Sequence, residues 1–162
     1  MNENEMPKTA EDFIDRAIEY GNKGESDKAI ADLDQAIKLD PESKEAYYYR
    51  GVEYQFKGEN DKAIEDYNNA IRFNPNVAEA YSNRGKAYRE KGELDLALAD
   101  YNQAIKIKPN SEFAYVNRGS LYATSKGTFA MAIEDFNTAL KINPNNANAK
   151  KSLEIINKIL SQ

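Results

Sequence analysis

The sequence contains no cysteine, no histidine and no tryptophan among its 162 residues. Without histidine and cysteine, the chain cannot use imidazole as a general base or a thiolate as a nucleophile, and disulfide bonds and nearly every structural zinc site are excluded. No apolar run approaches the roughly 18 residues of a membrane-spanning helix, so we expect no membrane insertion. The first eight residues lack the apolar segment of a secretory signal, which makes the cytoplasm the expected compartment.

Basic residues are outnumbered: 22 lysines and arginines stand against 27 aspartates and glutamates, which gives a net charge of -5. The chain therefore lacks the basic surface expected of a nucleic-acid-binding protein, and we expect no nucleic acid among its partners. It also has no glycine-rich phosphate loop, metal-ligand cluster or nucleophile–base pair. We therefore expect no enzyme activity, no cofactor and no bound metal. Tyrosine, by contrast, is abundant, with 11 residues.

A repeat with a period of 34 residues organises nearly the whole chain. Four prolines follow this step, the last of them one residue late: Pro41, Pro75, Pro109 and Pro144. The extra residue lies between Tyr122 and Gly127, where we expect it to lengthen a turn. Within each copy, recurring spacings of three and four residues predict two amphipathic helices. A glycine such as Gly92 ends the first helix, and an Asn-Pro or Asp-Pro pair ends the second.

The third copy contains the pattern Tyr81-x-x-Arg84-Gly85-x-x-Tyr88, followed by Ala97-x-x-x-Tyr101, Ala104 and Pro109. This pattern resembles the tetratricopeptide repeat, and the resemblance extends over about residues 10 to 160. It implies an all-α fold, an α-solenoid of antiparallel helix pairs in a right-handed superhelix. We predict a flexible tail over residues 1–9, repeats over 10–43, 44–77, 78–111 and 112–146, and a C-terminal capping helix over 147–162.

An arginine column departs from the family pattern, which often has leucine at the same position. An aspartate column in the second helix accompanies it, so that Arg16, Arg50, Arg84 and Arg118 are followed by Asp32, Asp66, Asp100 and Asp135. We interpret the two columns as ion pairs between packed helices, with the arginine stem covering apolar surface. The alternative is a ladder of guanidinium groups that receives an acidic ligand.

The resemblance also implies a concave face, lined by the first helix of each repeat, that binds a peptide or a partner's helix. Four rings exceed what helix packing needs, namely Tyr48, Tyr49, Phe56 and Phe113. Such rings favour protein recognition because they offer a large contact area at low rotamer cost. The alternatives are scattered exposed hydrophobic residues and, for Phe56, a plug between neighbouring helices. We predict a partner-binding groove formed by Ile14, Ile18, Tyr48, Tyr49, Val52, Phe56, Asn83, Lys86, Arg89, Phe113, Val116 and Asn117.

Family members give two further indications about this groove. Asparagines at the positions of Asn83 and Asn117 often bind the backbone of a peptide in such proteins. Chaperone-binding members add a clamp of lysine and arginine around the terminal carboxylate of the peptide. This clamp is mostly missing here, because Ile14, Ile18, Tyr48 and Val52 hold sites that would need lysine and asparagine. The resemblance therefore disfavours binding of a chaperone tail.

Charge is distributed unevenly along the repeats. Residues 10–43 contain four basic and ten acidic residues, a net charge of -6, whereas residues 147–162 contain three basic and one acidic, a net charge of +2. This polarity orients a charged ligand or favours head-to-tail self-contact, unless the acidic residues only solvate a helix surface. We expect a non-catalytic adaptor that binds a peptide segment or amphipathic helix of another protein. The alternative is a homo-oligomer that assembles through the groove or the solenoid ends.

Overall fold

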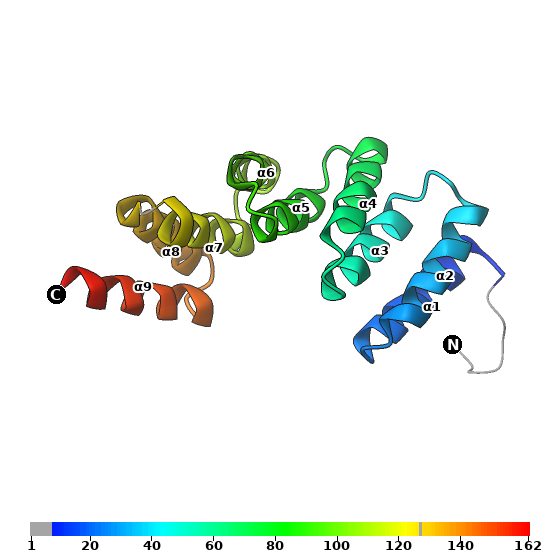
Figure 1. Cartoon of the computed structure of the whole chain (residues 1–162), viewed down its shortest axis with the longest axis horizontal. Coiled ribbons are helices and arrows are strands. Elements are labelled where there is room, and N and C mark those ends of the chain that lie inside the picture. The colour runs from blue at the N-terminus through cyan, green and yellow to red at the C-terminus, as the bar shows by residue number, and fades with distance from the viewer. Residues whose placement is uncertain (1–7, 127) are drawn as a thin grey trace. The chain divides into compact units, whose positions relative to one another are not determined.

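The computed structural model describes residues 8–126 and 128–162, which form nine α-helices and one π-helical turn, without a strand among them (Figure 1). The all-α solenoid expected from the sequence is confirmed. Within the described ranges, every helix is too short or too polar to cross a lipid bilayer. Of the predicted N-terminal tail, only Lys8 and Thr9 are described. The chain divides into two compact units, Met1–Asn76 and Val77–Gln162.

The first unit contains two helix pairs, α1 (Ala10–Asn22) with α2 (Ser26–Leu39) and α3 (Lys44–Phe56) with α4 (Asn60–Phe73). Both α1 and α2 also contact α3, which joins the pairs. The turn within each pair contains a glycine in the left-handed region, Gly24 with φ 74° and Gly58 with φ 75°. Because L side chains disfavour this region, each glycine allows the chain to reverse tightly enough for the two helices to pack together.

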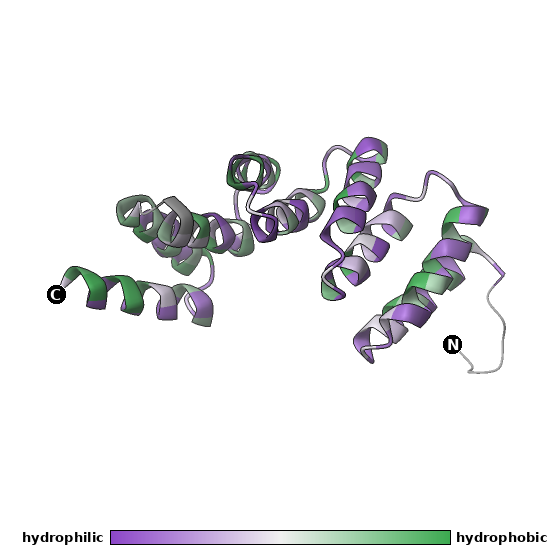
Figure 2. Cartoon of the chain, viewed as in Figure 1, coloured by the Kyte–Doolittle hydropathy of each residue, from purple (hydrophilic) through white to green (hydrophobic). Residues whose placement is uncertain are grey.

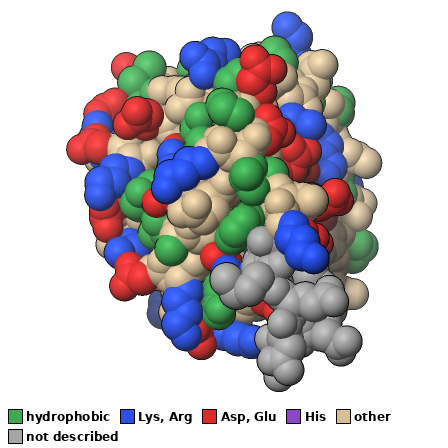
Figure 3. Space-filling model, turned by 90° about the vertical axis from the view of Figure 1, so that its right-hand side faces the viewer, with side chains coloured by type: hydrophobic (Ala, Val, Ile, Leu, Met, Phe, Trp, Pro, Cys, Tyr) green, Lys and Arg blue, Asp and Glu red, His purple; other side chains and the backbone are tan. Residues whose placement is uncertain are grey.

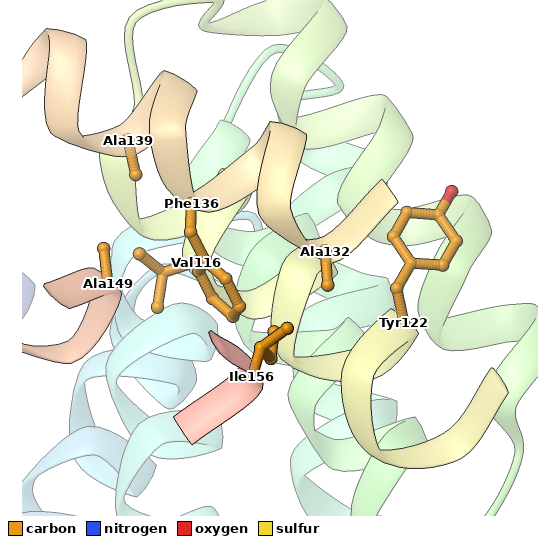
Figure 4. Packing of buried hydrophobic residues seen from close by; sticks show 7 residues of the cluster. All are labelled: Val116, Tyr122, Ala132, Phe136, Ala139, Ala149 and Ile156. Carbon is orange, nitrogen blue, oxygen red and sulfur yellow. The ribbon is translucent and has the colours of Figure 1, made fainter. Parts of the chain in front are cut away.

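The second unit contains α5 (Ala78–Glu90), α6 (Leu94–Ile107), α7 (Glu112–Leu121), the π-helical turn η1 (Tyr122–Lys126), α8 (Phe129–Ile142) and α9 (Ala147–Leu160). Here α5 packs on α6, α7 packs on α8, and α9 contacts both α7 and α8. Figure 4 shows a buried cluster in this unit, to which α9 contributes Ala149 and Ile156. The helix thereby covers Phe136 and its apolar neighbours.

The extra residue of the last copy is accommodated at the end of α7 by the π-helical turn. In the other copies, a backbone N–H closes the first helix by donating to a tyrosine carbonyl five residues earlier, as from Glu93 to Tyr88 at 2.9 Å. In the last copy, the N–H of Thr128 donates to the carbonyl of Tyr122, six residues earlier, at 3.0 Å. The segment of chain that this hydrogen bond closes is therefore one residue longer in the last copy. The insertion widens the last helical turn, whereas the sequence suggested a longer connecting turn.

Each arginine of the repeated column forms a bidentate ion pair with the aspartate of the following helix. Nε of Arg50 donates to Oδ2 of Asp66 at 2.8 Å, and Nη2 donates to Oδ1 at 2.7 Å. The other pairs have N–O distances between 2.6 and 2.9 Å, in Arg16–Asp32, Arg84–Asp100 and Arg118–Asp135. The predicted pairing is confirmed.

Two further contacts explain why arginine replaces leucine at these positions. The guanidinium carbon of Arg50 lies 5.6 Å from the ring centroid of Tyr47 and 6.0 Å from that of Tyr54, within the range of cation–π attraction. Nη1 of Arg50 also donates to Asp34 of α2 at 2.6 Å. One side chain therefore connects α2, α3 and α4. The hydrogen bonds from Arg50 to Asp66 raise the pKa of the arginine, because they stabilise its charged form.

Candidate functional site

In the first unit, the predicted groove residues lie on two helices that touch each other. Ile14 and Ile18 stand four residues apart on α1, and Tyr48, Val52 and Phe56 follow at the same spacing on α3. Residues four apart share one side of a helix, so each set forms a stripe. Because α1 contacts α3, the first unit brings the two helices that carry these stripes together.

The exposure of these side chains differs sharply. Phe56, in the last turn of α3, is 81% exposed and is the most exposed large hydrophobic residue of the described chain. Ile18, Tyr48 and Val52 are half-buried. Phe56 therefore does not plug a gap between helices, which was the alternative raised by its sequence position.

Tyr49 has a packing role that its sequence position did not reveal. Together with Ile14 it lies against the buried cluster of α1, α2 and α3 that includes Leu33. The ring of Tyr48 meets the ring of Tyr49 edge to face, with centroids 5.2 Å apart. Tyr49 and Ile14 therefore contribute to the scaffold of the first unit, whereas Phe56 leaves most of its surface open.

In the second unit, the predicted residues Asn83, Lys86 and Arg89 lie on α5, and Phe113, Val116 and Asn117 lie on α7. The two helices contact each other. Nδ2 of Asn117 donates to Oγ of Ser82 at 3.2 Å, which links α7 to α5. Phe113, in the first turn of α7, is 66% exposed.

The position of Val116 corrects the prediction that it lines the groove. Val116 is 8% exposed and belongs to the cluster of Phe136 and Ile156 (Figure 4). Its burial follows from the contact between α9 and α7, because α9 brings Ile156 into that cluster. Val116 is therefore a core residue of the second unit.

The charges on the first helices differ between the two units. Exposed Glu11 and Asp15 lie on α1, whereas α5 carries Lys86 and Arg89 among the predicted groove residues. Nζ of Lys86 lies 4.0 Å from Oε1 of Glu90, a contact on an exposed helix surface. Such a pair holds the lysine weakly, so the predicted face of α5 retains an accessible positive charge.

A surface hollow of about 440 Å³ lies in the first unit, and its lining contains none of the predicted groove residues. Its lining consists of Gly24, Glu25, Ser26, Asp27, Lys28 and Lys57. The charged groups of this lining pair with one another, as in the hydrogen bond of 2.6 Å from Lys57 to Asp27. Acidic and basic side chains also alternate across the face of the molecule shown in Figure 3. The charged side chains of the lining therefore neutralise one another, and the hollow does not indicate a site for a charged ligand.

Comparison with known proteins gives matches along most of the chain. A model of the TPR repeat matches residues 19–58, 53–88 and 85–125, and a model of the tetratricopeptide repeat matches residues 114–146. A crystal structure of MamA is 33% identical with a TM-score of 0.77, and the alignment covers 85% of this chain and 80% of that one. No curated protein sequence matches the chain.

Two more distant structures share the fold. A thermophilic TPR protein of Thermus thermophilus is 22% identical with a TM-score of 0.74, with 84% of this chain and 75% of that chain covered. A chain of the APC/C hetero-tetramer Cut9-Hcn1 is 22% identical with a TM-score of 0.84, with 92% of this chain and 30% of that chain covered. With family matches that extend from residue 19 to residue 146, the chain belongs to the tetratricopeptide repeat family.

Proposed function

We propose that the chain is a non-catalytic adaptor. It binds a peptide segment or a helix of a partner protein through the first helix of its repeats. Tetratricopeptide repeats are generally interaction modules without catalytic activity, which supports this proposal. The cytoplasm, expected from the N-terminal sequence, is the compartment we propose for it.

The observation that carries the proposal is the exposure of Phe56. Covering a phenylalanine side chain contributes about 1.5–3 kcal/mol, and buried aromatic residues are common anchors of protein interfaces. Val52 and Tyr48 continue from Phe56 along the same stripe of α3 and present partly open apolar surface. Phe113 offers a similar exposed ring on α7 of the second unit. The proposed partner covers at least the stripe on α3.

A peptide selected from a random library against the intact chain provides the test. We expect Phe56→Ser to weaken binding of that peptide at least about tenfold, because an anchor of this kind contributes more than about 1.4 kcal/mol. Leu39→Ser is the matched control, since Leu39 is 55% exposed but lies in the last turn of α2, outside the predicted groove. Calorimetric titration measures both affinities. Equal affinities for wild type and Phe56→Ser, or failure to select any peptide, would contradict the proposal.

Self-assembly is the second candidate, and the composition of α9 favours it. Figure 2 shows that α9 becomes hydrophobic toward its C-terminal end. Ile155, Ile159 and Leu160 are 51%, 49% and 60% exposed there. Basic residues outnumber acidic ones on this helix, whereas residues 10–43 are strongly acidic. A contact between α9 of one copy and the acidic end of another would join copies head to tail, and such contacts extend into open chains.

Sedimentation velocity over a wide concentration range tests this candidate. We expect the average mass of the wild-type chain to rise with concentration, and the rise to weaken at high salt because charge attraction is screened. Replacing both Ile155 and Ile159 by Lys should keep the chain monomeric. Leu96→Lys on α6 is the control, because Leu96 is 49% exposed but distant in sequence from α9. A monomer at all concentrations would exclude assembly of this kind.

A further inference from the structure

Glu53, on α3, is a buried residue, and one of its two carboxylate oxygens has no hydrogen-bond donor among the described residues. The residue is 8% exposed, and its Oε2 accepts no hydrogen bond within the part of the chain that the structure describes. Burial of such a group without a compensating bond disfavours folding. An ionised carboxylate is the costliest such group to leave without a partner, so Glu53 is the one for which a partner from outside the chain would contribute most.

The surroundings of Glu53 increase its need for a positive charge. A Cβ atom at Gly21 would overlap Oε1 of Glu53, so the carboxylate lies against the backbone of α1 one residue before that helix ends. The C-terminal end of a helix carries partial negative charge. Neither α1 nor α3 has a basic residue in its last turn. The end of α1 therefore offers the carboxylate no favourable helix-dipole interaction.

The lysines that follow these helices do not neutralise Glu53. Lys23 caps α1 and Lys57 caps α3. Lys57 donates to Asp27 at 2.6 Å and lies 3.5 Å from Glu59. Within the described ranges, no ion pair joins Glu53 to either lysine. A cationic side chain of another molecule is therefore one group that could neutralise Glu53.

The position of Glu53 on α3 indicates how such a cation would arrive. Tyr49, Glu53 and Phe56 stand at i, i+4 and i+7, so their side chains follow one another along one stripe of the helix. Tyr49 is partly buried against the cluster of the first unit, Glu53 comes next, and Phe56 is exposed in the last turn of the helix. A long cationic side chain can lay its stem or its charge against an aromatic ring and place its donors on a carboxylate.

We infer that Glu53 pairs with a lysine or arginine side chain of the partner segment, so that the first unit binds a segment that is both basic and apolar. This inference rests on the proposed function. The net charge of -6 on residues 10–43 adds attraction at longer range. Ala87 and Leu121 hold the position of Glu53 in the two later copies. The cation site therefore belongs to the first unit.

The test uses a random peptide library displayed on phage, selected against the intact wild-type chain and against Glu53→Gln, which keeps the shape and removes the charge. The wild type is expected to enrich peptides that combine lysine or arginine with an aromatic or aliphatic residue. Glu53→Gln should lose the preference for basic residues. Glu19→Gln is the matched control, because Glu19 holds the equivalent position on α1 and is exposed.

A double-mutant cycle with the most enriched peptide then measures the interaction free energy between Glu53 and the basic residue of the peptide. We expect Glu53→Gln to weaken binding about tenfold, and replacement of the basic peptide residue by an uncharged isostere to weaken binding to wild type equally. The same replacement should change little in Glu53→Gln, and Glu19→Gln should bind within about twofold of wild type. An additive cycle would overturn the inference.

Other outcomes separate the inference from the proposed function. Enriched peptides without lysine or arginine, whose binding is lost in Phe56→Ser, would overturn the cation site and leave the adaptor function standing. Failure to enrich any peptide would contradict both. The unbound chain gives an independent readout, because removing an unpaired buried charge should raise the melting temperature of Glu53→Gln. A lower melting temperature would show an internal partner for Glu53 and would overturn the inference.

Discussion

Replacing Arg50 by Leu is expected to lower the free energy of unfolding by about 3–5 kcal/mol, which is the usual cost of leaving a buried charge without its partner. The charge left behind is that of Asp66, which is 2% exposed and receives two hydrogen bonds from Arg50. Leucine and arginine have similar helix propensities, so the loss reports the interactions of the Arg50 side chain and not a change in helix propensity. Urea unfolding followed by circular dichroism measures it.

Two further variants show whether the buried charge is the cause. Replacing Arg50 and Asp66 together by Leu should recover much of the loss, because no unpaired charge remains. Lys62→Ala breaks the exposed ion pair with Glu59 and should change the free energy by less than about 1 kcal/mol. If Arg50→Leu were as stable as the wild type, the pair would have no structural role, and the arginine column would again be available for an acidic ligand.

Most of the fold could be predicted from the sequence because each copy repeats the same environments. Gly24, Gly58 and Gly92 recur at one position of the first three copies, and each follows the end of a helix with a positive φ. The insertion after Tyr122 was located correctly, but its form was not. Whether an extra residue enters a turn or a helix depends on which carbonyl receives the closing hydrogen bond, and the bond from Thr128 to Tyr122 settled this in three dimensions.

The candidate site was less predictable, because helical periodicity shows which side of a helix a residue occupies but not what covers it. Val116 has the spacing of a groove residue, yet the cluster that α9 completes buries it. The sequence places both Phe56 and Tyr49 among the aromatic rings that helix packing does not need, but of these two only Phe56 is largely exposed. Glu53 was overlooked because the sequence does not show that its carboxylate lies against the backbone of α1. The available signal was a glutamate at a position that holds Ala87 and Leu121 in later copies.

Replacing Gly85 by Ala is expected to lower the free energy of unfolding by about 2 kcal/mol through overpacking, even though alanine favours a helix over glycine by about 1 kcal/mol. A Cβ at this position would lie 2.8 Å from Cε1 of Tyr101 and 3.2 Å from the carbonyl oxygen of Ala97. Tyr101 is fully buried, so its ring has little room to withdraw. Thermal and urea unfolding measure the loss.

The first copy of the repeat indicates how this loss can be reversed. Ala17 stands there at the glycine position, and Leu33 replaces the ring, with both residues buried in one cluster. Combining Gly85→Ala with Tyr101→Leu should therefore recover part of the stability. The hydroxyl of Tyr101 has no hydrogen-bond partner among the described residues, so leucine removes no such bond. A double variant less stable than Gly85→Ala alone would mean that the backbone of α6, which holds the Ala97 carbonyl, requires the glycine.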